Sequence, residues 1–213
     1  IAIWSVKRDI KIILKFDTYR GIKDNNDVNN NLVGIRERNL EKDRIEKLGK
    51  YRPAVFCDKM YNCALNQNLY GININKEAIK KIKKAIVYEA EKSVMLQGTK
   101  FGLKKNFSVA SYGSYIYPKQ VEILINLGVE EIIFAPDHDF VSNVSQEAIK
   151  VKKRIVKVAK NFRGLVNFTV MLDRDNVLGY KSAPIECDKE EFLKLYKNRL
   201  NVLQVDELIK LYK

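Results

Sequence analysis

Two short apolar segments of the chain are each followed by acidic residues. The segment Ala85–Tyr88 leads into Glu89, and the segment Glu131–Ala135 is followed by Asp137 and Asp139. Short runs rich in β-branched and aromatic residues are typical of buried strands in a parallel sheet. Ligands of such sheets bind beyond the carboxyl ends of the strands. The pattern therefore predicts that these carboxylates meet in one crevice.

Carboxylates placed in this way point to a hard divalent cation. Alternate side chains of an extended segment face the same side, so Asp137 and Asp139 are expected to ligate one ion together with Glu89. No cysteine and only His138 accompany them, which favours Mg²⁺ or Mn²⁺. The alternative is that each acid caps the helix after its strand. His138 is interpreted as a loop residue rather than a catalytic base.

From residue 85 onward, predicted strands alternate with predicted helices. Pro118 suits the first position of a helix, and Gly128 suits the position just after its end. This alternation is typical of βαβ units and predicts an α/β fold with a Rossmann-like parallel sheet flanked by helices. Strands are expected at 85–88, 107–110, 131–135 and 165–172, and helices at 91–104, 118–127 and 146–162.

The two ends of the chain have a weaker pattern. Residues 10–14 are apolar, residues 24–31 predict a polar loop or hairpin tip, and residues 32–38 predict a strand. The pattern indicates irregular structure from 40 to 75, a short lysine-rich helix at 76–84, and a helical tail from about residue 189.

The composition indicates which classes of binding partner are expected. The net charge is +13 with a pI near 9.5, which favours a polyanion; the alternative is a lysine-rich composition that reflects an AT-rich genome. No apolar run approaches the roughly 20 residues of a membrane helix, so no membrane partner is expected.

Three cysteines form no disulfide framework and indicate a reducing compartment. The chain begins at Ile1, which is consistent with a fragment of a longer protein.

Several basic and small residues are further candidates for binding a nucleotide or a nucleic-acid strand. Arg36 and Arg38 alternate on one strand face, and Lys50 precedes Tyr51. Such residues can hold a triphosphate or a nucleic-acid strand, although a solvated surface explains each of them alone. Gly113 follows the second strand of the α/β part, where it would let a phosphate approach the backbone or would simply form a tight turn.

A set of short motifs occurs in a specific order. It comprises Gly34 with Arg38, Lys50-Tyr51, Leu69-Tyr70-Gly71, Glu89-Ala90-Glu91-Lys92-Ser93, Gly113, Asp137-His138-Asp139, and Leu178-Gly179-Tyr180-Lys181-Ser182-Ala183-Pro184-Ile185-Glu186. As a set, these motifs resemble the catalytic core of bacterial-type, DnaG-like DNA primases of the sort carried by phages and mobile elements. The resemblance spans about residues 30 to 200.

The resemblance implies a domain organisation and an activity. It implies a mixed α/β primase subdomain over 1–82, a Toprim subdomain over 83–175 and a helical segment over 176–213. It also implies metal-dependent synthesis of short RNA primers on single-stranded DNA from ribonucleoside triphosphates. A replicative helicase is a further partner, and the location would be the cytoplasm, that of the bacterial host if the gene is phage-borne.

The resemblance also implies site roles. Glu89 would be the general acid/base or the carboxylate that organises the metal, and Asp137 and Asp139 would hold Mg²⁺ or Mn²⁺. The residues implied to face nucleotide or nucleic acid are Arg36, Arg38, Lys50, Lys92 and Gly113.

Departures from the family pattern keep two alternatives open. Ala90 replaces a glycine, Ser182 stands where an aspartate is usual, and Phe140 replaces a small turn residue. One alternative is another Toprim enzyme, such as a nuclease. The other is a degenerate, non-catalytic Toprim module that binds nucleic acid, which Ala90 and Ser182 favour.

Overall fold

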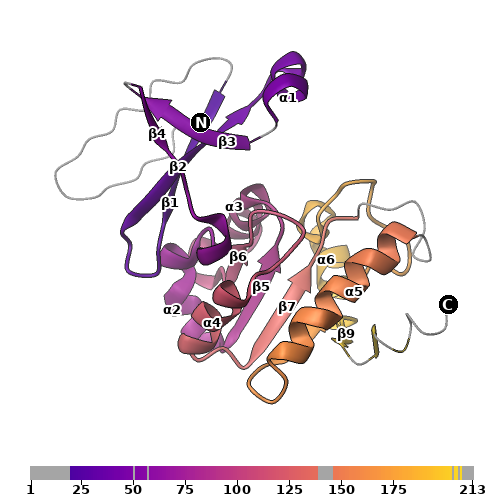
Figure 1. Cartoon of the computed structure of the whole chain (residues 1–213). Helices are drawn as coiled ribbons and strands as arrows, with labels where there is room; N and C mark the ends of the chain where they lie inside the picture. The colour runs from indigo at the N-terminus through magenta and orange to yellow at the C-terminus, as the bar shows by residue number, and fades with distance from the viewer. Residues whose placement is uncertain are drawn as a thin grey trace. The chain divides into compact units, whose positions relative to one another are not determined.

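The computed structural model describes residues 20–49, 51–56, 58–138 and 146–202, together with residues 204, 205 and 207. Of these, residues 20–25 and Leu32–Cys63 form one compact unit, and Asn26–Asn31 with the residues from Ala64 onward form a second (Figure 1). The predicted apolar segment 10–14 lies outside the described residues. The predicted subdomain boundaries after residues 82 and 175 stay predictions.

The first unit is a four-stranded sheet with one helix. The strands follow one another in the order β1-β2-β3-β4, and β2 pairs antiparallel with β3 as β3 does with β4. The polar segment predicted as a hairpin tip does connect the first two strands. The elements are β1 (Arg20–Asn26), β2 (Leu32–Asn39), α1 (Lys42–Leu48), β3 (Tyr51–Phe56) and β4 (Lys59–Tyr61).

The prediction that residues 40–75 are irregular is wrong in part, because α1, β3 and β4 lie there. These elements are short and lack a periodic apolar pattern; β3 is held by pairing with β2, and β4 by pairing with β3. The β2–β3 register places Glu37 opposite Arg52, and the two side chains form an ion pair. Such cross-strand pairs stabilise a sheet without leaving a local signal in either strand.

The second unit confirms the predicted α/β class. Its five-stranded sheet has the order β6-β5-β7-β8-β9, in which β9 alone is antiparallel to its neighbour. The elements are α2 (Ile72–Ile82), β5 (Lys84–Tyr88), α3 (Glu91–Phe101), β6 (Ser108–Ala110), α4 (Pro118–Asn126), β7 (Glu131–Ala135), α5 (Gln146–Asn161), β8 (Asn167–Val170), α6 (Lys189–Lys197) and β9 (Leu200–Asn201), with short 3₁₀ turns at Leu65–Gln67, Leu103–Lys105 and Pro184–Glu186.

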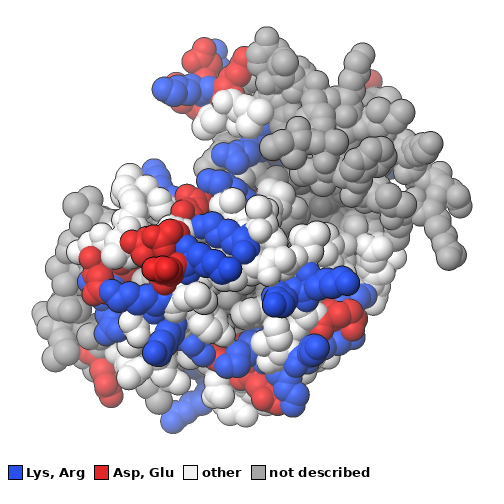
Figure 2. All heavy atoms as spheres, turned by 180° about the vertical axis from the view of Figure 1, so that it is seen from behind, with Lys and Arg blue, Asp and Glu red and all other residues white. Residues whose placement is uncertain are grey.

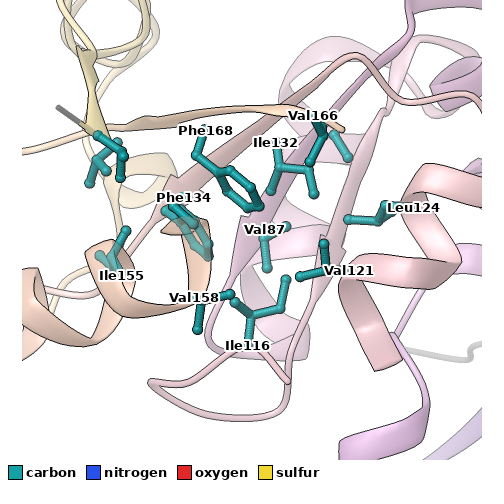
Figure 3. Packing of buried hydrophobic residues seen from close by; sticks show 14 of the residues in the cluster. Val87, Ile116, Val121, Leu124, Ile132, Phe134, Ile155, Val158, Val166 and Phe168 are labelled. Carbon is teal, nitrogen blue, oxygen red and sulfur yellow. The ribbon is translucent and has the colours of Figure 1, made fainter. Parts of the chain in front are cut away.

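Strands β5, β6 and β7 of this sheet send alternate side chains into two cores. Val87 and Phe134 face one core, which Val121 of α4 and Val158 of α5 also line (Figure 3). The next residue of each strand faces the other core, which α3 and α6 cover. Strands of a sheet that is buried on both faces are apolar throughout, and the sequence therefore predicts these strands clearly.

Two boundaries differ from the predictions. Helix α2 begins at Ile72 rather than at residue 76 and ends at Ile82, because Lys83 adopts a left-handed conformation before β5. The tail is helical from Lys189 to Lys197, Leu200–Asn201 then pairs as an edge strand with β8, and residues 202, 204, 205 and 207 are helical again. Residues 203, 206 and 208–213 of the predicted tail lie outside the described residues. No helix of the described chain has the length and apolar character to cross a membrane.

A buried ion cluster holds the edge of the sheet together. The Glu131 carboxylate accepts hydrogen bonds from Arg199 (2.7 and 3.1 Å) and Thr169 (2.8 Å), and Lys84 Nζ lies 2.7 Å away. Burial alone raises the pKa of Glu131, but the hydrogen bonds from Arg199, Lys84 and Thr169 outweigh it and lower the pKa to about 2. The cluster thus links β5, β7, β8 and the residue that precedes β9.

This cluster predicts a pH-dependent stability. The folded state lowers the pKa of Glu131 from its ordinary 4.5, so its contribution is present above about pH 4.5 and is lost as the pH falls toward 2. We expect Glu131→Gln to lower the free energy of unfolding by about 2–3 kcal/mol at pH 7. Urea unfolding should show that the difference in the free energy of unfolding between this variant and wild type is smaller at pH 3 than at pH 7. Glu130→Gln removes only an exposed pair with Lys83 and should cost under about 1 kcal/mol; equal losses for both variants would contradict this assignment.

Candidate active site

The carboxyl ends of β5 and β7 bring two of the predicted acids together. The parallel register pairs Tyr88 with Ala135, the last residues of the two strands. Glu89 therefore leaves the sheet beside Pro136 and Asp137, and its carboxylate accepts a hydrogen bond from the Asp137 backbone N–H at 3.3 Å. Both acids are half-buried. The structure thus places the Glu89 carboxylate beside the backbone of Asp137; a crevice shared by the carboxylates of Glu89, Asp137 and Asp139 stays a prediction.

Hydrogen bonds fix the end of β5 next to Glu89. The Tyr88 carbonyl accepts from the Ser111 backbone N–H at 2.9 Å, and the Ser111 hydroxyl lies 3.2 Å from the same carbonyl. The Tyr88 hydroxyl is buried and donates to Gln97 of α3 at 2.5 Å. Burial raises the pKa of Tyr88 well above its ordinary value, so this phenol stays neutral and acts as a structural anchor.

The crevice lies where the strand order of the sheet reverses. The chain passes from β5 to β6 on one side and then to β7 on the other, and ligands of open parallel sheets bind at this switch point. A pocket lies here. Its polar lining comes from three segments of the second unit and includes Glu89 after β5, Ser111, Gly113 and Ser114 after β6, and Arg154 of α5.

Arg154 is a site residue that sequence reasoning missed. It lies on α5 and lines the pocket together with Glu89. In the sequence it is one of many basic residues of an amphipathic helix, and nothing in its neighbours separates it from a solvated surface residue. Only the packing of α5 against β5 and β7 shows which of these cations reaches the switch point.

The segment after Asp137 is held by a loop from later in the chain. The His138 backbone N–H donates to the Ser182 carbonyl, and the Lys181 N–H donates to the His138 carbonyl, both at 2.9 Å. His138 is buried, with Nδ1 3.4 Å from the Asp173 carboxylate. Ser182, one of the departures from the family pattern, therefore lies beside the candidate site.

Asp173 has a structural contact that spacing alone could not reveal. Its carboxylate accepts backbone hydrogen bonds from Val177 at 3.0 Å and Leu178 at 2.8 Å, and it is buried. It therefore holds the turn that begins the loop of residues 178–182. Asp175, two residues on, is largely exposed and pairs with Lys194.

The Ala90 departure introduces no backbone strain. Ala90 precedes the first residue of α3 with φ −114° and ψ 148°, an extended conformation open to any residue.

Lys92, predicted to face nucleic acid, forms an ion pair with Glu186 at 2.9 Å. Gly113 lines the pocket, and a Cβ built on it would meet no atom within 4 Å. Protein packing therefore does not explain why position 113 is a glycine.

The remaining predicted residues belong to the first unit or lie outside the described chain. Arg36 and Arg38 share one face of β2, as predicted, and their guanidinium groups lie over the Tyr51 ring at 4.9 and 5.6 Å from its centroid. Lys50 and Asp139 lie outside the described residues. The roles of all these residues stay predictions.

The described residues offer oxygen ligands of the kind that Mg²⁺ takes. Among the described residues, no three His, Cys, Asp or Glu side chains form a metal-binding group. The Glu89 carboxylate lies beside the backbone of Asp137, from which it accepts a hydrogen bond. Mg²⁺ commonly binds one or two carboxylates and completes its shell with substrate phosphates and water, so this pair fits a phosphate-bearing substrate.

Comparison with known proteins gives the fold. A DNA primase domain from Pseudomonas aeruginosa matches with a TM-score of 0.65 at 16% identity over 89% of this chain and 54% of that one. A DnaG primase catalytic domain bound to single-stranded DNA matches with a TM-score of 0.61 at 16% identity over 86% of this chain and 53% of that one. The chain has the fold of a DnaG primase catalytic core.

One curated relative and the family models complete the comparison. The uncharacterized SPbeta prophage-derived protein YorJ of Bacillus subtilis (strain 168) is 32% identical over 183 residues, which are 83% of this chain and 48% of that protein. No family model matches. The chain thus spans about half the length of the relative and of the primase structures that it matches.

The turn that Asp173 holds provides a stability test of this primase-like core. Asp173→Ala removes the acceptor of two backbone hydrogen bonds, one of them to buried Leu178. We expect the free energy of unfolding to fall by about 1–3 kcal/mol. Asp175→Ala removes only an exposed ion pair and should cost under about 1 kcal/mol. Urea unfolding of both variants checks this, and losses of equal size would refute the structural role of Asp173.

Proposed function

We propose that this chain is the catalytic core of a DNA primase. In this proposal it joins ribonucleoside triphosphates into short RNA primers on a single-stranded DNA template. The observation that carries the proposal is the hydrogen bond between the Glu89 carboxylate and the Asp137 backbone, at the switch point of a sheet with the primase core fold.

Nucleotidyl transfer requires the functional groups that the crevice supplies. The 3′ hydroxyl of the growing strand attacks the α-phosphorus of the incoming triphosphate, and pyrophosphate leaves. A group that accepts the hydroxyl proton and groups that offset the phosphate charge both lower the barrier. Glu89 would accept the proton or organise the metal, and Asp137, with Asp139, would orient the triphosphate through the cation. Arg154 at the rim of the pocket would face the phosphates.

Mg²⁺ or Mn²⁺ is the proposed cofactor, and its ligands would be Glu89, Asp137 and Asp139. When bound, such an ion neutralises the developing charge on the phosphate oxygens. The oxygen ligands of the pair suit a hard cation, and the ion would also relieve the repulsion between the two carboxylates.

The nucleic-acid partner is proposed from three properties. The net charge of +13 favours a polyanion, and a neighbour with the same fold binds single-stranded DNA. In the first unit, Arg36 and Arg38 stack on Tyr51, which presents two cations and an aromatic ring together. Such a surface suits nucleotides and single strands, because it combines charge with a stacking face.

Primer synthesis with isosteric variants tests the proposal. Glu89→Gln retains the oxygen that accepts from Asp137 and removes only the charge, so the fold should persist. We expect Glu89→Gln and Asp137→Asn to lower the rate of primer synthesis by at least about 100-fold. The assay uses single-stranded DNA, ribonucleoside triphosphates and Mg²⁺ or Mn²⁺.

The matched control is Glu122→Gln, which changes an exposed glutamate of α4 paired only with Lys119. It should leave the rate unchanged. Metal-dependent cleavage of the template without primer synthesis would favour a nuclease instead. Template binding with neither reaction, in wild-type protein, would favour a non-catalytic binding module.

A further inference from the structure

The solvent face of α5 is a row of cations. The residues of this row recur every three or four positions, so they lie on one side of the helix. All of them are exposed, while Ile155 and Val158 on the opposite side pack into the core. The row consists of Lys150, Lys153, Arg154, Lys157 and Lys160; it is called the α5 basic row below.

The α5 basic row differs from the other charged surfaces of the second unit. Several lysines elsewhere pair with carboxylates, as in Lys119 with Glu122 and Lys194 with Asp175 at 3.0 Å. On the face opposite to the view of Figure 1, Asp and Glu side chains lie among the Lys and Arg side chains (Figure 2). Within the described chain, no carboxylate pairs with Lys150, Lys153 or Lys157. Like charges so crowded repel one another, and a polyanion relieves that repulsion.

The geometry of the row matches a phosphate backbone. Each turn of the helix carries one or two of these cations, and successive turns are about 5.4 Å apart. The helix is held rigidly because its other face packs on β5, β7 and β8 through the core of Figure 3. A straight, regularly spaced row of cations can neutralise successive phosphates of a strand.

The row is continuous with the candidate active site. Arg154 belongs to the α5 basic row and also lines the pocket that Glu89 lines. A strand whose reacting end lies at the switch point would therefore meet α5 on leaving the pocket. This continuity distinguishes the row from a surface that is merely solvated.

We propose that the α5 basic row binds the phosphate backbone of a nucleic-acid strand that runs from the Glu89 pocket along α5. The contacts are ionic and read no sequence. The proposal rests on the proposed function only for the identity of the ligand in the pocket; binding along α5 does not require catalysis.

Salt-dependent binding tests this surface. The variant Lys150→Gln/Lys153→Gln/Lys157→Gln leaves the pocket residue Arg154 in place. Fluorescence anisotropy would measure its affinity for a single-stranded and for a double-stranded DNA of equal length between about 50 and 200 mM salt. Loss of three phosphate contacts should reduce the slope of log K against log salt by about 2 for a single strand or about 3 for a duplex. The form of DNA whose slope falls by its expected amount is the one that lies on α5.

The control variant Lys81→Gln/Lys104→Gln/Lys105→Gln removes three exposed lysines elsewhere on the same unit. It should keep a slope close to wild type. Equal slopes for the two triple variants would overturn the proposal, because the effect would then reflect net charge alone. Thermal unfolding of both variants confirms that they are folded. Glu89→Gln, measured in parallel, should keep the wild-type slope, so a failure of the catalytic proposal is distinguishable from a failure of this one.

Discussion

The parallel pairing of β5 with β7 determines where the candidate catalytic groups lie. Because Tyr88 is in register with Ala135, Glu89 and Asp137 leave neighbouring strands at the same level of the sheet. The strand order turns back at this pair, and ligands of open parallel sheets bind at such a point. A shift of this register by one residue would send each core side chain to the opposite face, and the two buried cores together prevent it.

The rest of the second unit stabilises this edge. Ser111 fixes the end of β5, the loop at Lys181 and Ser182 pairs with His138, and Asp173 holds the turn from which that loop starts. These bonds hold the backbone on which Glu89 and Asp137 lie. Rigid positioning of this kind favours a site that binds a charged substrate through a cation.

The sequence predicts the second unit better than the first for a physical reason. Strands buried on both faces, such as Glu131–Ala135, are apolar throughout, and Pro118 and Gly128 mark the ends of α4. The elements of the first unit depend on cross-strand pairs such as Glu37 with Arg52, which no local pattern reveals. The convergence of Glu89 and Asp137 was predictable from topology, whereas the approach of Arg154 depends on how α5 packs.

A crystal of the protein soaked in Mn²⁺, together with a ribonucleoside triphosphate, tests the central claim most directly. An anomalous-scattering peak in contact with the carboxylates of Glu89 and Asp137 and with the phosphates is the predicted result. A peak elsewhere, or a triphosphate bound with the two carboxylates turned away from it, would contradict the claim that this crevice is a metal-dependent nucleotide site.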